Sequence, residues 1–437
     1  MTSTSKSKPL VLNLALMSLS LIFMAILSEA ALRFTHYRQY ISGYTLRYYY
    51  KADDQAGFDI VENAPRTLIR FEDAEYSIWS NEQGCFDEPY NGEQAYILLV
   101  GDSYTHHYAP LRDKWGKRIE DLLDLRVLTC GVGGYGLRQE YAKAKKIISK
   151  VNVPPKLIMV GYYIGNDLEE DYIFPDRTVI DGYRVAQRRV NLSTGEITSY
   201  DDQELEQQYV RYKKYGTTGT PKHVLVQRVN HWLKSHSILY HLSRRAAKRI
   251  LLRIPSFYQR LKRTSNMDFL ESPIELSFRD RKAYPWLERA WESHLRNFML
   301  FKKLADENSA KLLIVMIPTK RQVHPFLWGN AKVDPEYPNK LIEDFLEKEN
   351  IAYIDLLPYF RKYTRIADKG REKEKGLYQR FGGHWNIRGD HFAGLLVAKH
   401  ILESALLDVP DRNEKLRAIE DTLGHFGRLE IFERDQL

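Results

Sequence analysis

Ser103 stands where a protein can activate a nucleophile. It follows an unbroken apolar run, residues 96–100, through a Gly-Asp-Ser turn at 101–103. Such a run predicts a strand buried on both faces of a parallel sheet, and open α/β sheets bind ligands at the carboxyl ends of their strands. Backbone N–H groups in the turn can stabilise an oxyanion. Because the tripeptide is common, a plain helix cap would also explain it.

Three further segments occupy comparable places in the chain. A glycine-rich stretch, 131–136, follows a second apolar run, and Asn166 comes after a third at 157–160. His384 precedes a predicted helix at about 388–402. Since parallel strands end at one edge of a sheet, all four segments can converge there. A nucleophile, a base and oxyanion donors are what acyl transfer requires.

Taken together and in this order, the four segments resemble the sequence blocks of the SGNH/GDSL hydrolase family. The resemblance covers about residues 95–170 and 312–402. The stretch at 81–86 also resembles a motif found upstream of the serine in envelope-associated, membrane-anchored members. Each block is unspecific alone, whereas the set of four is specific.

The resemblance implies a role for each matching residue. Ser103 would be the nucleophile and His384 the base that takes its proton. The backbone N–H groups of Ser103 and Gly134 and the side-chain amide of Asn166 would be the oxyanion donors. The implied enzyme is a carboxylic ester hydrolase that works through an acyl-serine intermediate and needs no cofactor or metal.

One position departs from the family pattern. Members usually carry an aspartate two or three residues before the histidine, where this chain has Gly382 and Phe381. A main-chain carbonyl could orient the histidine, Asp390 could reach round to it, or the site could be weak or silent. We expect a working dyad or a carbonyl-assisted triad.

Two other kinds of site fit the sequence less well. Residues 131–136 spell the dinucleotide fingerprint Gly-x-Gly-x-x-Gly, but no acid stands at the tip of the next predicted strand, 157–160, where a Rossmann site needs one. His106 and His107 have no third ligand at metal-binding spacing. We expect these histidines to line the cleft beside Ser103 or to lie on the surface.

The rest of the chain must position these residues. Its 437 residues, 43% hydrophobic and 28% charged, are typical of a folded protein. Alternating strand and helix patterns predict a flavodoxin-like three-layer α/β/α sandwich with a parallel sheet across 95–405. A mainly helical insertion interrupts it at about 171–285. We expect an irregular lead-in at 35–94 and a loosely packed charged tail at 406–437.

The amino terminus carries an export signal. Residues 10–32 are long and apolar enough to cross a bilayer, which predicts a membrane anchor at 1–34 and an extracytoplasmic catalytic domain. A cleaved signal peptide is the alternative, because residues 28–30 resemble a cleavage site. Cys85 and Cys130 form a disulfide or remain two buried thiols.

Basic residues are concentrated in one stretch. Residues 211–263 hold fourteen Lys or Arg and no Asp or Glu, whereas the whole chain has a net charge of only +8. With interleaved apolar residues, this pattern suits a surface on anionic lipid headgroups or a track for an acidic glycan. A solvated helical face would look the same, and an exported chain does not suggest nucleic acid.

The sequence therefore predicts an envelope esterase acting on acyl groups, with O-acetylated carbohydrate as the expected substrate. An O-acetyltransferase of the same fold, which passes the acyl group to a polysaccharide, is one alternative. A catalytically silent glycan-binding protein is another, favoured only by the missing aspartate. The substrate class rests on family analogy rather than on residues of a pocket.

Overall fold

The computed structural model describes residues 7–35, 48–71, 74–92, 94–191, 193–215, 224–252, 276–279, 284–328, 333–368, 376–379 and 383–426. The chain divides into two compact units. The anchor unit comprises 1–46 and 208–265, and the sheet unit comprises 47–207 and 266–437. Each unit is described separately below.

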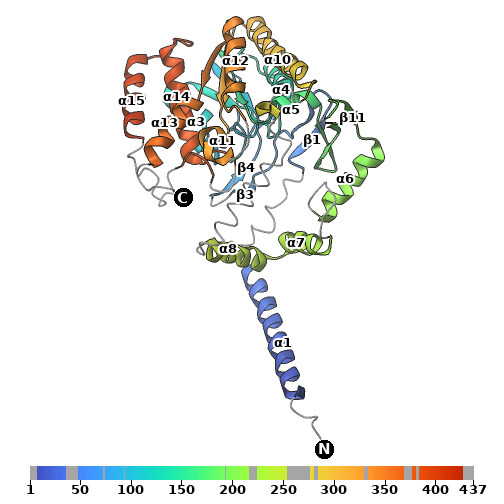
Figure 1. The fold of residues 1–437 in the computed structure, drawn as a ribbon. Helices are drawn as coiled ribbons and strands as arrows, with labels where there is room; N and C mark the ends of the chain where they lie inside the picture. The colour runs from blue at the N-terminus through green and yellow to red at the C-terminus, as the bar shows by residue number, and fades with distance from the viewer. Residues whose placement is uncertain are drawn as a thin grey trace, which may run out of the picture. The chain divides into compact units, whose positions relative to one another are not determined.

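A five-stranded sheet forms the centre of the sheet unit (Figure 1). All of its neighbouring strands pair in parallel. Its order is β6 (Arg126–Thr129), β5 (Tyr96–Gly101), β7 (Leu157–Tyr163), β12 (Lys311–Ile317) and β13 (Ala352–Asp355). Counted along the chain this is 2-1-3-4-5, the flavodoxin-like order. The predicted fold class is confirmed.

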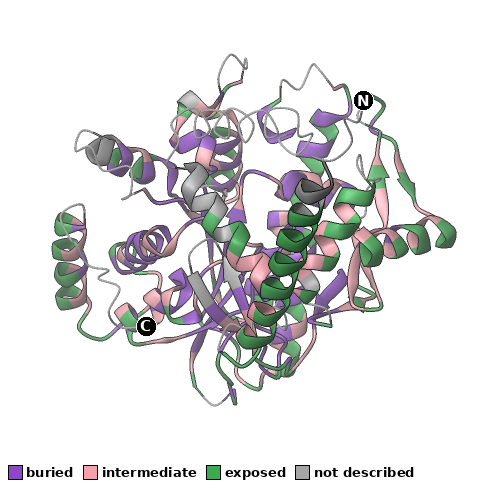
Figure 2. Cartoon of the chain, turned by 90° about the horizontal axis from the view of Figure 1, so that it is seen from below, coloured by how far each residue is buried: buried purple, intermediate pink, exposed green. Residues whose placement is uncertain are grey.

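Helices cover both faces of the sheet. Because side chains alternate along a strand, Ile97 and Leu99 of β5 join one hydrophobic core, while Leu98 and Val100 join the other. The first core packs against α3 (Trp115–Leu123), α13 (Leu357–Asp368) and α14 (Ile387–Glu403). The second packs against α4 (Leu137–Lys150), α10 (Leu287–Glu307) and α12 (Tyr337–Lys348). Figure 2 shows the strands between these helices as buried.

The lead-in contains strands that the sequence did not reveal. Two antiparallel pairs form there: β1 (Tyr50–Asp53) with β2 (Gly57–Ile60), and β3 (Thr67–Phe71) with β4 (Ala74–Ile78). The expectation of an irregular segment is therefore wrong over these residues. Each strand has only four or five residues, and every residue of β2 is buried, so no polar–apolar alternation marks it.

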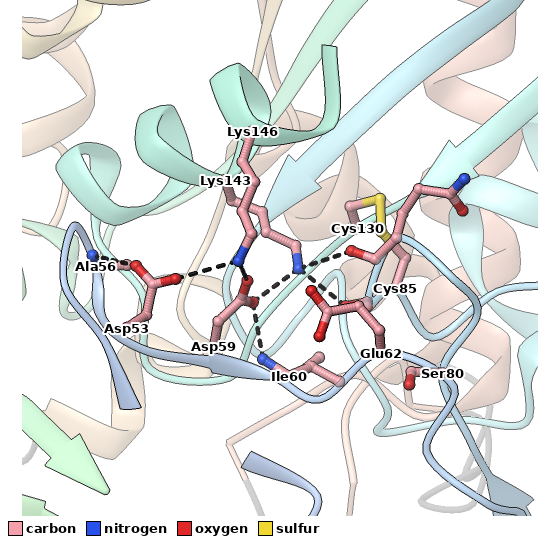
Figure 3. A network of polar contacts seen from close by, with 12 residues as sticks. Asp53, Ala56, Asp59, Ile60, Glu62, Ser80, Cys85, Cys130, Lys143 and Lys146 are labelled. Atoms are coloured by element: carbon pink, nitrogen blue, oxygen red, sulfur yellow. Dashed lines mark hydrogen bonds and ion pairs between the residues drawn. A yellow bond between two sulfur atoms is a disulfide. The ribbon is translucent and has the colours of Figure 1, made fainter. Parts of the chain in front are cut away.

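Polar contacts and a disulfide fasten the lead-in to helix α4 and to the loop after β6 (Figure 3). The ammonium of Lys143, on α4, lies 2.7 Å from the carboxylate of Asp59, and both side chains are buried. Lys146 bridges Asp53 and Asp59 at 3.1 and 2.8 Å. Removing one partner of a buried pair costs roughly 3–5 kcal/mol. Cys85 and Cys130 are disulfide-bonded, which decides between the two states that the sequence left open.

The insertion begins with hairpins before it becomes helical. The strands β8 (Arg177–Ile180) and β9 (Tyr183–Ala186) pair, as do β10 (Arg188–Val190) and β11 (Ile197–Ser199). Within its described residues the insertion then forms the helices α6 (Asp202–Tyr215), α7 (Val224–His236) and α8 (Ile238–Leu252). Asp181 and Gly182, with φ of 47° and 80°, form the two-residue turn between β8 and β9. Asp-Gly between apolar runs is a strong hairpin signal.

The carboxyl-terminal region is also more ordered than expected. Helix α15 (Arg412–His425) buries Ile419 in the first core, so the expected loose packing is wrong there. Lys415 donates to the main-chain oxygen of Leu123 at 2.8 Å, and Glu420 lies 3.1 Å from Lys399. The apolar residues Leu416, Ile419 and Leu423 recur at helical spacing, which was visible among the charges.

The first helix, α1 (Ser7–Leu32), is long and apolar enough to span a membrane. Its segment Ala15–Leu32 has a mean hydropathy of 2.0, and none of it is buried within the protein. A signal sequence meets the same criteria. The other short helices in the part of the chain that the structure describes are α5 (Asp167–Ile173), α11 (Lys320–Val323), η2 (Leu111–Asp113), η3 (Leu276–Phe278) and η5 (Pro325–Trp328).

Candidate active site

Three adjacent strands bring Ser103, Gly134 and Asn166 to one edge of the sheet. Ser103 follows β5, the glycine-rich loop with Gly134 follows β6, and Asn166 follows β7. Since β5 lies between β6 and β7, the serine segment lies between the other two. The chain reverses its direction of winding here, which is where open α/β sheets form ligand sites. Ser103, Gly134 and Asn166 are each partly exposed, although most neighbouring residues are buried.

Backbone contacts fix the serine turn tightly. The buried carboxylate of Asp102 accepts from the Tyr104 N–H at 2.8 Å and lies 3.0 Å from Ser103 Oγ. Burial raises the pKa of Asp102 to about 6. A Cβ on Gly101 would stand 2.2 Å from the Thr105 hydroxyl, so only glycine fits before this turn.

Ser103 and His384 lie within hydrogen-bonding distance, with 2.9 Å between Ser103 Oγ and His384 Nε2. The ring of Tyr108 stacks on the imidazole, with 3.6 Å between centroids and 6° between planes. Tyr104 donates to the main-chain oxygen of Gly383 at 2.7 Å. Burial, together with the charge of Lys114, lowers the pKa of His384 to about 3. The imidazole is therefore neutral near pH 7 and can accept a proton.

The structure excludes one proposed replacement for the missing aspartate. Asp390 is buried and pairs with Lys114 at 2.9 Å, and it also accepts from the Trp115 N–H at 3.2 Å. The alternative in which Asp390 orients His384 is therefore not what the structure shows, because the described contacts of its carboxylate are with Lys114 and the Trp115 N–H and none is with His384. Phe381 and Gly382 lie outside the described residues. Within the part of the chain that is described, no oxygen accepts a hydrogen bond from His384 Nδ1.

The loop after β6 runs beside the serine. The Val132 N–H donates to Gly101 O at 2.9 Å, and a Cβ on Gly133 would stand 3.7 Å from Ser103 Cβ. Arg184, from β9, donates to Gly133 O at 2.6 Å. Arg177, from β8, donates to the Gly134 oxygen at 3.4 Å. Both arginines come from the insertion, and the analysis of the sequence missed them.

Asn166 and Gly134 lie on the expected segments, but no contact in the described structure joins either to Ser103 or His384. Asn166 is the N-cap residue before α5, and its amide donates to the Glu170 carboxylate. The amide nitrogen of Asn166 carries two hydrogens, so the bond to Glu170 leaves one hydrogen to donate to another acceptor. Gly134 has φ of 87°, a left-handed conformation that favours glycine.

His106 and His107 are buried behind the serine turn and are not a surface feature. Their Nδ1 atoms lie within hydrogen-bonding distance of each other, and His106 Nε2 lies 3.1 Å from the Tyr49 hydroxyl. Burial lowers the pKa of both rings, that of His107 to about 3. Among the residues that the structure describes, no cluster of three His, Cys, Asp or Glu side chains could hold a metal.

No protein-family model matches the chain, and no curated protein matches it. It is similar to the solved structure of an acetyl xylan esterase, with 10% identity, 71% of this chain and 98% of that chain covered, and a TM-score of 0.32. It is also similar to the solved structure of a putative lipolytic protein of the G-D-S-L family from Desulfitobacterium hafniense. That match has 9% identity, covers 70% of this chain and 98% of that chain, and has a TM-score of 0.30.

A carbohydrate acetylesterase family member from Sinorhizobium meliloti gives 12% identity, 72% and 100% coverage and a TM-score of 0.30. Likeness at this level carries no argument about the activity of this chain. The strand order alone identifies the fold. It is a flavodoxin-like α/β sandwich, the fold that the family resemblance implies.

Proposed function

We propose that this protein is a serine esterase of the SGNH/GDSL type, with Ser103 as its nucleophile. The observation that carries the proposal is the 2.9 Å separation between Ser103 Oγ and His384 Nε2 at the carboxyl edge of the sheet. A nucleophile within hydrogen-bonding distance of a neutral imidazole is the minimal machinery for acyl transfer.

The reaction would proceed in two halves. Ser103 Oγ attacks the acyl carbon while its proton passes to His384 Nε2, and the tetrahedral intermediate collapses as His384 returns the proton to the departing alcohol. Water then attacks the acyl-serine with His384 again as the base. The second collapse releases the acid and restores the serine hydroxyl.

The negative charge of each intermediate needs donors beside Ser103. We assign these to the N–H groups of Ser103 and Gly134 and to the Asn166 amide, in agreement with the family resemblance. Each such donor contributes about 3 kcal/mol to the transition state. The order β6-β5-β7, which sets these segments on either side of Ser103, supports this assignment.

His384 would act without a carboxylate partner. Stacking with Tyr108 restricts the tilt of the imidazole, a role that a hydrogen-bonded acid performs in a triad. The hydrogen bond from Tyr104 to Gly383 O fixes the preceding backbone. These contacts favour a dyad that is preorganised by packing, although its base is weaker than that of a triad.

The substrate we propose is an O-acetylated carbohydrate of the cell envelope. Tyr108 and Tyr163 lie partly exposed at the site, where Tyr163 packs against the buried Tyr104 ring, and exposed aromatic rings suit sugar faces. An export helix and the Cys85–Cys130 disulfide support an extracytoplasmic location.

Acetate release from an O-acetylated polysaccharide by the full chain in detergent micelles tests the proposal. Ser103→Ala should abolish release, whereas Ser199→Ala, at an exposed serine of β11, should not change it. Acetate in solution indicates a hydrolase, and acetyl groups on an added glycan acceptor indicate a transferase. Full activity of Ser103→Ala would overturn the nucleophile assignment.

A further inference from the structure

Helix α7 of the anchor unit turns its apolar side outward. Leu225, Val229 and Trp232, spaced four and three residues apart, form one stripe, and their exposed fractions are 73%, 48% and 57%. In water an amphipathic helix buries such a stripe and exposes its polar side. The orientation of α7 is the reverse, which indicates that an apolar medium or partner covers this stripe.

The inward side of α7 is polar and makes specific contacts with α8. Asn230 Oδ1 accepts from the Tyr240 hydroxyl at 2.6 Å. The main-chain oxygen of Lys234 lies 2.6 Å from His241 Nε2. These hydrogen bonds fix the rotation of α7 about its own axis, so the outward direction of the stripe follows from the packing of the unit.

The last turn of α1 holds the junction between α7 and α8. The Glu29 carboxylate accepts from the backbone N–H groups of Ile238 and Leu239 at 3.1 and 3.0 Å, and from the Ser237 hydroxyl at 2.8 Å. It thereby caps the amino terminus of α8. Arg33 donates to the last main-chain oxygen of α7, that of His236, at 3.0 Å.

These contacts fix the position of α7 along the axis of α1. Glu29 and Arg33 stand at the end of the segment that could cross a membrane, Ala15–Leu32. Figure 1 shows α7 and α8 at this end of α1. A helix fixed there lies where the hydrocarbon core gives way to headgroups, and tryptophan is enriched at that depth.

Charge specifies the kind of membrane surface. The stretch 211–263 contains no acidic residue, and Arg228 and Arg244 are exposed on α7 and α8. Basic residues near a bilayer are attracted to anionic lipids, and an exposed apolar stripe adds insertion to that attraction. Apolar and basic side chains on one helix pair match an anionic bilayer surface better than they match a soluble partner.

We propose that α7 lies in the interface of an anionic lipid bilayer, with Leu225, Val229 and Trp232 directed into the acyl boundary. Contacts with the end of α1 hold α7 at this depth. The anchor unit would then attach the protein through a spanning helix and a surface helix. This inference is independent of the proposed esterase activity.

A single fluorophore on α7 tests the proposal in the full chain. The only two cysteines are joined in the Cys85–Cys130 disulfide, so Leu225→Cys supplies one reactive thiol without removing a buried side chain. The variant is labelled with an environment-sensitive dye under non-reducing conditions and placed in nanodiscs containing phosphatidylglycerol. Lys303→Cys, at a position 74% exposed in the sheet unit, is the control.

The expected result is at least about twofold stronger quenching of the Leu225→Cys label by shallow doxyl lipids than of the Lys303→Cys label. Replacing phosphatidylglycerol with phosphatidylcholine should weaken that quenching. Equal quenching at the two positions would overturn the proposal. A blue-shifted label that doxyl lipids do not quench would overturn it in favour of a protein cover such as a second copy. Quenching that does not depend on lipid charge would refute the anionic specificity.

Discussion

The two halves of the proposed dyad are held by different kinds of interaction. Ser103 continues directly from a central strand, and both the turn before it and the loop beside it leave no room for a side chain at Gly101 or Gly131. His384 lies in a short segment before α14, and its imidazole is positioned by the stacked ring of Tyr108. Backbone geometry thus fixes the nucleophile, while side-chain packing fixes the base.

The site should tolerate substitutions around the base better than substitutions around the nucleophile. A strand and its hydrogen-bonded turn hold the backbone of Ser103 in one conformation. An imidazole held by packing has a softer energy minimum than one held by a carboxylate, because stacking is weakly directional. Substitutions around His384 should therefore lower activity in graded steps.

The largest effect should come from removing the base. His384→Ala should lower kcat for ester hydrolysis by about 10³-fold or more, because Ser103 then has no group to take its proton. His425→Ala, at an exposed histidine of α15, is the control and should leave kcat unchanged. Equal loss of activity in both variants would indicate damage to the fold rather than to the dyad.

A smaller effect should follow from loosening the base. Tyr108→Ala should lower kcat by about 10- to 100-fold, since the imidazole loses the ring that limits its tilt. Tyr108→Phe keeps the ring and should retain most of the activity. If steady-state kinetics gave the two variants the same kcat, stacking would not be what positions His384.

On the nucleophile side, Arg184 should act through the backbone. Arg184→Ala should lower kcat by about tenfold with little change in KM, because the Gly133–Gly134 peptide that it holds is needed only when the oxyanion forms. Arg189→Ala, on the neighbouring hairpin, is the matched control. A lower Tm with unchanged kcat would reduce Arg184 to a structural role.

The smallest effect should be that of pH. Burial lowers the pKa of His384 to about 3, from an ordinary value of 6.5, and the neutral ring is the active form. Hydrolysis should therefore fall no more than about twofold between pH 8 and pH 5. Asp102, whose pKa is raised to about 6, gains a proton in this range without removing the base. An acidic limb near pH 6.5 that persists in Asp102→Asn would contradict this account.

Much of the fold follows from local sequence patterns. Apolar runs predicted β5, β6 and β7, and a helix was predicted at about 388–402, where α14 lies. The sequence did not predict the hairpins of the lead-in, because their strands have only four or five residues and show no clear alternation of polar and apolar residues. The β8–β9 hairpin had a readable signal in Asp181-Gly182. The apolar stripe of α15 also predicts a helix, but the many charged residues around it obscured the pattern.

The site was predictable only in part, for a physical reason. The ends of the strands predict that the segments of Ser103, Gly134 and Asn166 meet, whereas the pairing of Ser103 with His384 came from the family resemblance. Which side chains approach from an insertion depends on long-range packing, so Arg184 and its contact with Gly133 could not be inferred. The pairing of Asp390 with Lys114 and the outward direction of the apolar side of α7 also depend on long-range packing, so neither could be inferred from the sequence.

The central claim is that His384 activates Ser103 without a triad aspartate, and covalent labelling tests it most directly. The full chain in detergent micelles is treated with a fluorophosphonate probe and analysed by peptide mass spectrometry. The account predicts an adduct on Ser103 that is lost in His384→Ala and retained in His425→Ala. An unlabelled Ser103, under conditions that modify a control esterase, would contradict the claim and favour a silent glycan-binding protein.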